Sequence, residues 1–341
     1  MGTAGNETAL TPDTSALADG VLARDRRALA QAITLVESTR PDHRTQAGAL
    51  LQALMPHTGQ SIRLGISGVP GVGKSTFIEA LGNHVIDAGR RVAVLTVDPS
   101  SAISGGSILG DKTRMETLSR RPEAYIRPSP AGKTLGGVTR RSREALIVCE
   151  AAGFDVVIVE TVGVGQSETR VANMTDMFML LLLPGGGDEL QGIKRGIMEL
   201  ADLVLINKAD DEMVGLAKRS ASQYRNALRL LHPRSKHWKV QVKTCSARDG
   251  AGVAEAWDVV LNHNEVLTQS GELSARRADQ ARDWMWSELN DTLLAALRDD
   301  PVVGRQVPLL EAAVGEGNIP PVTAARQLLE LFLRQSGKTD H

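Results

Sequence analysis

The sequence predicts an α/β protein whose core is a doubly wound, mostly parallel β-sheet. Two observations carry this prediction. Between Ser61 and Thr244, short runs of Val, Ile and Leu alternate with stretches of helical periodicity, and such unbroken apolar runs are typical of strands covered on both faces. Polar residues follow directly after several of the runs, and doubly wound sheets bind their ligands beyond the carboxyl ends of their strands.

Six strands are expected in this region: Ile62–Ser67, Arg91–Val97, Val156–Glu160, Phe178–Leu183, Leu203–Asn207 and Val240–Thr244. Before them, apolar residues at helical spacing from Leu17 to Leu54, interrupted by Pro41, predict two amphipathic helices. After them, similar patterns over Leu273–Leu297 and Val322–Leu333 predict a helical tail. We therefore expect an N-terminal helical extension over residues 1–58, an α/β domain over 59–265 and a C-terminal helical arm over 266–341.

Composition limits which binding partners and which cellular location are expected. The 341 residues carry 39 Lys and Arg against 40 Asp and Glu, so the net charge of −1 gives no electrostatic case for nucleic acid or an anionic membrane. The two cysteines, Cys149 and Cys245, lie far apart and suggest neither a disulfide framework nor a thiolate metal site. The first twenty residues lack the pattern of a signal or transit peptide. A cytoplasmic protein is expected.

A glycine-rich loop follows the first predicted strand and opens a helix. It consists of Gly68, Val69, Pro70, Gly71, Val72, Gly73, Lys74 and Ser75, with Thr76 next. In this strand–loop–helix setting the pattern matches a phosphate-binding loop (P-loop), since glycines let successive backbone N–H groups converge on phosphate oxygens and the helix N-terminus adds its dipole. Lys74 should reach the β- and γ-phosphates, and the Ser75 hydroxyl should ligate Mg²⁺. The alternative is a plain turn before an ordinary helix.

Three acids are candidates for the magnesium site beside Ser75. Glu160 ends an apolar strand in a Walker B-like arrangement, Asp98 ends the strand from Arg91, and Asp111 follows the Gly/Ser-rich stretch 100–110. Mg²⁺ prefers octahedral oxygen ligation and keeps several waters, so the three need not all be direct ligands. For each acid the competing interpretation is a helix cap or a turn residue.

The residues after Glu160 indicate how the γ-phosphate is sensed. Gly163 should place its amide near the γ-phosphate. In the small regulatory GTPases a water-orienting Gln follows this glycine, whereas here the position is Val164 and the nearest Gln is Gln166. We therefore expect slow intrinsic hydrolysis, with catalysis depending on another segment or a partner.

A guanine-reading motif ends the fifth predicted strand, as Asn207-Lys208-Ala209-Asp210. The Asp210 carboxylate can accept hydrogen bonds from N1–H and the 2-amino group of guanine, whereas adenine offers an acceptor at N1 and has no amino group at position 2. Lys208 should pack its stem on the base, and the loop with Ser246 and Ala247 should offer backbone N–H groups to the guanine O6. The motif predicts GTP and GDP, with Mg²⁺, as ligands rather than ATP.

Taken together, these residues resemble the MeaB/ArgK family of GTPases, relatives of the bacterial nickel-insertion GTPases. The resemblance covers nearly the whole chain. Its specific stretches are VDPSSAISGGSILGDKTRM from Val97, SPAGKTLGGVTRRSREA from Ser129, ETVGVGQSE from Glu160, LPGGGDELQGIKRGIMELADLVLINKAD from Leu183 and GNIPPVTAARQLLE from Gly317.

The resemblance implies a homodimeric, GTP-hydrolysing chaperone that protects an adenosylcobalamin-dependent acyl-CoA mutase, most often methylmalonyl-CoA mutase, and gates loading of its cofactor. It leaves open which mutase is the client and whether an adenosyltransferase joins the complex. It also implies that Asp98, Asp111 and Glu160 are the magnesium-linked acids, that the C-terminal helices dimerise, and that the family's mobile segment maps onto residues 185–196.

Within residues 185–196, Lys194 and Asp188 are the candidate catalytic residues. A GTPase without Gln after Gly163 needs another source of transition-state stabilisation, and a cation brought to the phosphates supplies it. The hypothesis is that a client closes this segment and brings Lys194 to the phosphates, with Asp188 fixing its position or contacting the nucleotide, and with Arg195 as the alternative donor. The competing interpretation is a solvated strand-to-helix connection.

Two other functions are compatible with parts of the sequence. One is a kinase or ATPase acting on a small molecule or transport protein, an older label for this family, against which the NKAD motif argues. The other is a nickel metallochaperone GTPase. Such proteins commonly carry His-rich tracts or paired Cys ligands, whereas the seven His residues here are scattered.

Overall fold

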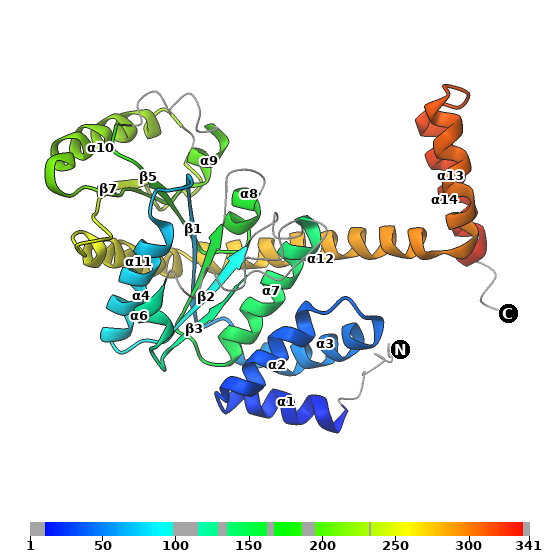
Figure 1. Cartoon of the computed structure of the whole chain (residues 1–341), viewed down its shortest axis with the longest axis horizontal. Helices are drawn as coiled ribbons and strands as arrows, with labels where there is room; N and C mark the ends of the chain where they lie inside the picture. The colour runs from blue at the N-terminus through cyan, green and yellow to red at the C-terminus, as the bar shows by residue number, and fades with distance from the viewer. Residues whose placement is uncertain are drawn as a thin grey trace. The chain divides into compact units, whose positions relative to one another are not determined.

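The computed structural model describes residues 11–97, 115–128, 135–161, 167–185, 195–231 and 233–336. The chain forms two compact units, Met1–Arg277 and Ala278–His341. The first unit contains the sheet, and the second consists of helices (Figure 1). None of the described helices is both long and apolar enough to cross a bilayer.

The sheet of the first unit is parallel throughout its described strands, with the order β3-β2-β4-β1-β5-β6-β7. Its strands are β1 (Ile62–Gly68), β2 (Val92–Val97), β3 (Ala124–Arg127), β4 (Val156–Thr161), β5 (Met177–Leu182), β6 (Leu203–Ile206) and β7 (Gln241–Thr244). Six of them coincide, to within a residue or two, with the six predicted strands. The doubly wound parallel sheet is therefore confirmed.

Strand β3 was not predicted. Its four residues, Ala-Tyr-Ile-Arg, lie between Pro122 and Pro128 and contain a single aliphatic β-former, Ile126. A run this short carries too little periodicity to be recognised. It forms because it can complete the edge beside β2, where Val94 pairs with Ile126.

Helices cover both faces of the sheet. One face packs on α4 (Lys74–Asp87), α6 (Glu116–Ser119) and α11 (Val253–Gln269). The other packs on α7 (Leu135–Ala151), α8 (Ser167–Ala172), α9 (Arg195–Leu200) and α10 (Val214–Leu228). Because side chains alternate along a strand, Ile158 faces α4 while Val157 and Val159 face α7. This alternation decides later which functional side chains can meet.

The N-terminal region contains three helices rather than the two expected: α1 (Pro12–Leu22), α2 (Arg26–Glu37) and α3 (Pro41–Leu54). The expected first helix is divided because Arg24 adopts a left-handed conformation, with φ 65°, and Asp25 caps α2 by accepting from the Ala28 N–H at 2.6 Å. These helices pack against α7, where Arg44 forms a two-point ion pair with buried Glu144 at 2.8 and 3.0 Å.

The C-terminal region contains α12 (Glu272–Asp299), α13 (Pro301–Gly315) and α14 (Pro321–Ser336). Short 3₁₀ turns lie earlier in the chain, η1 (Met55–His57) after α3 and η3 (Asp211–Met213) before α10. Helix α13 was not predicted, because its prolines read as breaks. Pro301 instead occupies the first turn, where no backbone donor is needed, and Asp300 caps the helix through Val302 and Val303. At the start of α12, Arg277 pairs with buried Asp176 at 2.6 Å.

Buried His263 on α11 makes folding stability depend on pH. Its ring is 1% exposed and packs edge-on to Trp238, and the nearest carboxylate oxygen, on Asp202, lies 3.9 Å away. Burial lowers the pKa of His263 from 6.5 to about 4, against the partly opposing charge of Asp202. The unfolded chain therefore binds a proton at a higher pH than the folded chain does, and stability falls as the pH drops from 6.5 towards 4.

We predict that His263→Leu flattens this pH dependence by about 2 kcal/mol between pH 7 and pH 4.5, following the linkage between pKa shift and stability. Chemical denaturation of both proteins at pH 7 and pH 4.5 measures it. The exposed His57 provides the matched control as His57→Leu. Parallel pH profiles for wild type and His263→Leu would contradict the prediction.

Candidate functional site

The glycine-rich loop after β1 is already shaped to receive phosphates. Lys74, the first residue of α4, donates its Nζ to the carbonyl oxygens of Gly68 at 2.7 Å and Val69 at 3.3 Å. These bonds fold the lysine back over the loop, so its ammonium group lies within the curve of the backbone. Ser75 follows in the first helical turn, where the N-terminal N–H groups of α4 are directed towards the loop.

Gly73 must be glycine for two reasons. Its φ is 93°, in the left-handed region, and a Cβ there would lie 2.8 Å from Nδ2 of Asn207. That amide donates to the Val72 carbonyl at 2.8 Å, while its Oδ1 accepts from the Ala247 N–H at 3.0 Å. Asn207, 1% exposed, thus joins the phosphate loop to the loop after β7.

The base-reading carboxylate is held from the same loop. Ser246 donates its hydroxyl to Oδ2 of Asp210 at 2.8 Å, so the carboxylate is oriented by the chain itself. Lys208 has a left-handed φ of 57° and an exposed side chain, which leaves its stem available to lie on a base. The structure therefore brings Asn207, Lys208, Asp210 and Ser246 together at the carboxyl ends of β6 and β7.

Glu160 lies at the carboxyl end of β4 and is 4% exposed. It lies two residues after Ile158 and so on the same face of the strand; because Ile158 packs in the cluster that includes α4, the Glu160 side chain faces the P-loop helix. Next to it, Thr161 donates its hydroxyl to Ser67 at 2.8 Å across to β1. The predicted metal residues Ser75 and Glu160 thus belong to the same face and the same edge of the sheet.

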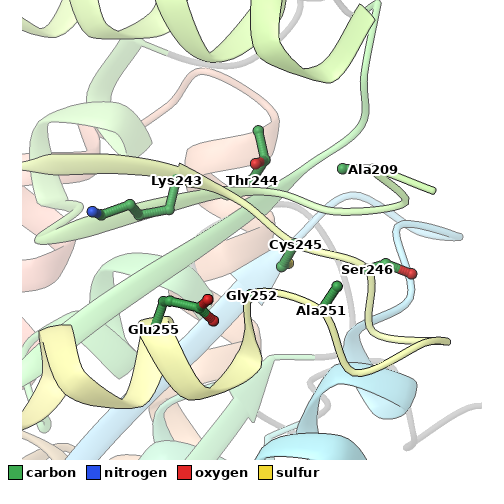
Figure 2. Close-up of a pocket in the computed structure, with 8 residues that line it drawn as sticks. All are labelled: Ala209, Lys243, Thr244, Cys245, Ser246, Ala251, Gly252 and Glu255. Carbon is green, nitrogen blue, oxygen red and sulfur yellow. The ribbon is translucent and has the colours of Figure 1, made fainter. Parts of the chain in front are cut away.

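A cavity of about 330 Å³ lies against the base-reading loop (Figure 2). Its lining residues are Ala209, Lys243, Thr244, Cys245, Ser246, Ala251, Gly252 and Glu255. In Figure 2, Ala209 and Ser246 lie at one end, and Lys243 and Glu255 at the other. Burial raises the pKa of Cys245 to about 12, so this thiol stays protonated.

Several predicted site residues lie outside the described residues: Asp98, Asp111, Gly163, Asp188 and Lys194. Within the described part of the chain, no group of three His, Cys, Asp or Glu side chains is arranged to hold a metal ion. Arg248 is a neighbour of the base site that was not predicted. Its guanidinium bonds Asp211 at 2.8 Å and Asp249 at 2.9 Å, and only its position after Ser246 and Ala247 could have signalled it.

A parallel doubly wound sheet, a P-loop and an NKAD motif joined through one asparagine define a P-loop GTPase. The family described as "Methylmalonyl Co-A mutase-associated GTPase MeaB" matches residues 29–301. The chain belongs to this family and hydrolyses GTP, as the resemblance in the sequence implied.

Relatives along almost the whole chain support this membership. A protein of Caulobacter vibrioides described as "Putative GTPase" is 57% identical over 320 residues, covering 94% of this chain and 98% of that protein. The mouse protein "Methylmalonic aciduria type A homolog, mitochondrial" is 49% identical, covering 92% and 78% respectively. A crystal structure described as "LAO/AO transport system kinase" is 38% identical, with a TM-score of 0.75, covering 94% and 98%.

Proposed function

We propose that this GTPase is a chaperone for an adenosylcobalamin-dependent acyl-CoA mutase, with methylmalonyl-CoA mutase as the client, and that it protects the mutase and gates loading of its cofactor. The observation that carries this proposal is membership of a family described as mutase-associated, along most of the chain. The name of the mouse relative agrees with it. The older kinase or transport label would require ATP, which Asp210 disfavours.

In the proposed complex, guanine lies between the Lys208 stem and the loop after β7, with its N1–H and 2-amino group donating to Asp210. The Ala247 N–H, already donated to Asn207, would be shared with the guanine O6. The phosphates would occupy the loop of residues 68–75, with Lys74 and the α4 N-terminus meeting their charge. The division into residues 1–58, 59–265 and 266–341 stays part of this proposal.

The chemistry of two residues at this edge of the sheet supports a Mg²⁺ site. Ser75 and Glu160 supply hydroxyl and carboxylate oxygens, which are the donors that Mg²⁺ prefers. Thr96 pairs in register with Glu160 on the neighbouring strand β2 and is 2% exposed. Its hydroxyl has no hydrogen-bond partner within the described residues, and a water of the metal's hydration shell would satisfy it. Bound there, the ion would neutralise phosphate charge, with Asp98 and Asp111 as the further proposed acids.

We predict that Glu160→Ala reduces the Mg²⁺ dependence of turnover and weakens discrimination between GTP and GDP, because this carboxylate acts through the metal. Titration of Mg²⁺ against hydrolysis rate and against GDP affinity measures both effects. Glu255→Ala, at the far end of the cavity in Figure 2, is the control. An unchanged Mg²⁺ dependence in Glu160→Ala would assign the acid a structural role.

The stretch after β5 is where a client could act on hydrolysis. At its described start, the Gly185 N–H donates to Ser220 Oγ of α10 at 2.9 Å. We propose that the client closes the residues that follow, bringing Lys194 to the phosphates with Asp188 positioning it. A cation delivered in this way can raise the rate by roughly 10³ to 10⁵-fold.

The test is GTP hydrolysis with and without purified methylmalonyl-CoA mutase for wild type, Lys194→Ala and Asp188→Ala. Intrinsic rates should be similar in all three proteins, while stimulation by the mutase is lost in both variants. Stimulation of Lys194→Ala equal to that of wild type would reject the role of this lysine. Absence of any stimulation or binding by wild type would reject the client.

We propose that the C-terminal helical arm, residues 266–341, mediates dimerisation. Apolar side chains at helical spacing are exposed on α12 in the single chain, namely Met285, Trp286, Leu289 and Leu293, at 42–58%. Exposed apolar surface of this kind marks an interface between proteins. The mass of the full chain in solution tests the proposal, and a monomer at micromolar concentration would contradict it.

A further inference from the structure

Helix α10 and the segment after it carry a strong net positive charge, whereas the rest of the chain is net negative. Between Met213 and Thr244 there are eight Lys or Arg residues and no Asp or Glu, in a chain whose net charge is −1. One of the eight, Arg234, forms an ion pair with buried Asp202, with 3.3 Å between the guanidinium nitrogen and the carboxylate oxygen. Lys218, Arg219 and Arg225 are exposed on α10, and the exposed Arg229 follows directly at its C-cap.

Three of these cations form a row along one side of the helix. Lys218, Arg225 and Arg229 are spaced i, i+7 and i+11, which places them within about 40° of one another around a helix of 3.6 residues per turn. An adjoining side of the helix, about 60–120° further round, is buried through Ala217, Ala221 and Tyr224. We call Lys218, Arg225 and Arg229, with Arg219 beside them, the basic row.

No member of the basic row has an ion pair or side-chain hydrogen bond in the described part of the chain. By contrast, Arg44, Arg63 and Arg277 are each paired with a buried acid. Four like charges kept together without carboxylate partners repel one another, and an acidic partner would relieve this repulsion.

The chemistry of the surroundings favours a protein partner. The aromatic side chains nearest in sequence, Tyr224 and Trp238, are buried, so neither offers a platform for stacking nucleic acid bases. The apolar face of α10 is buried in the core, so the helix cannot insert into a membrane surface. At the two ends of the row, Val214 and Leu230 are 38% and 84% exposed, and a mixture of cations and aliphatic residues suits a protein interface.

We propose that the basic row is a docking surface for an acidic face of the client protein. Its position in the fold places a docked partner close to residues proposed to bind the nucleotide. Helix α10 begins four residues after Asp210, the base-reading acid. Its Ser220 accepts a hydrogen bond from Gly185, where the stretch after β5 begins, on which the client is proposed to act. The identity of the partner as the mutase rests on the function proposed above. The preference for a carboxylate-rich protein surface rests only on the charges of the basic row.

The test compares the full-length triple variant Lys218→Glu/Arg225→Glu/Arg229→Glu with a control that carries the same change in charge, Arg27→Glu/Arg40→Glu/Arg120→Glu. The control residues are exposed and lie away from α10. The neutral triple variant Lys218→Gln/Arg225→Gln/Arg229→Gln provides a milder form of the same change. GDP affinity and basal hydrolysis should be unchanged in all of them, which also verifies folding.

Binding is measured with two probes, purified methylmalonyl-CoA mutase and fluorescein-labelled poly-L-glutamate, at 50 and 300 mM salt. We expect the Glu variant to lose roughly 10- to 100-fold in low-salt affinity for both probes, the Gln variant to lose less, and the control to stay within about twofold of wild type. Wild-type binding should weaken at high salt.

Equal losses in the α10 variant and the control would overturn the proposal, because net charge alone would then explain them. Unchanged binding of both probes by the Glu variant would overturn it as well, as would tighter wild-type binding to single-stranded RNA or phosphatidylserine vesicles than to poly-L-glutamate. If wild type binds poly-L-glutamate through the basic row but does not bind the mutase, the client assignment fails and the docking surface stands.

Discussion

Asp210→Asn should lower the affinity for GTP by roughly 10⁴-fold, the discrimination expected of a site built around hydrogen bonds to one base. The carboxylate can accept from both N1–H and the 2-amino group of guanine, and Ser246 holds it in place at 2.8 Å. An amide offers a donor where guanine also donates, so a buried pair of donors would face each other. Xanthine carries an oxygen at position 2 and should become the preferred base.

Calorimetric titration of GTP, ATP and xanthosine triphosphate into wild type and variant checks this expectation. Asp249→Asn is the matched control, because Asp249 is an exposed acid near the same loop, paired with Arg248. Its nucleotide preference should equal that of wild type. Equal affinity of wild type for ATP and GTP would refute the assignment of Asp210.

Lys74→Ala should reduce GTP hydrolysis by roughly 10³-fold, at the upper end of the loss for removing one pre-positioned donor to developing charge. The wild-type ammonium group already bonds the Gly68 and Val69 carbonyls, so it can meet the transferred phosphoryl group with little rearrangement. Because the loop amides and the α4 N-terminus remain, binding of GDP should decrease much less than the rate.

Single-turnover hydrolysis with GTP, together with GDP titration, separates these two effects. Lys239→Ala changes an exposed cation after α10 and should leave both unaltered. If Lys74→Ala hydrolysed GTP at the wild-type rate, the catalytic assignment of this lysine would be wrong.

The sequence predicted the sheet well where strands are long and apolar, and poorly where tertiary contacts decide. Strand β4 has six buried residues in a row and could be recognised alone. Strand β3 exists because it pairs with β2, and the division between α1 and α2 depends on the left-handed Arg24. Neither feature leaves a periodic signal in the sequence.

For the site, contiguous motifs were predictable, while the contacts between them were not. The P-loop and the NKAD motif were each recognised from neighbouring residues. The bond from Asn207 to the Val72 carbonyl joins residues 135 positions apart, and no local pattern encodes it. The face of Glu160 follows from strand alternation once the strand is known, whereas the roles of Asp98, Asp111, Lys194 and Asp188 stay predictions.

The amide of Asn207 has a thermodynamic consequence. One side chain contacts both the phosphate loop and the base loop, so ordering one loop also orders the other. The conformational entropy of both loops is therefore lost during folding rather than when the nucleotide binds. The affinities for the two ends of the nucleotide are then linked, and linkage is reciprocal. A partner that shifts the phosphate loop would change how tightly guanine is held, so it could promote nucleotide release without touching the base.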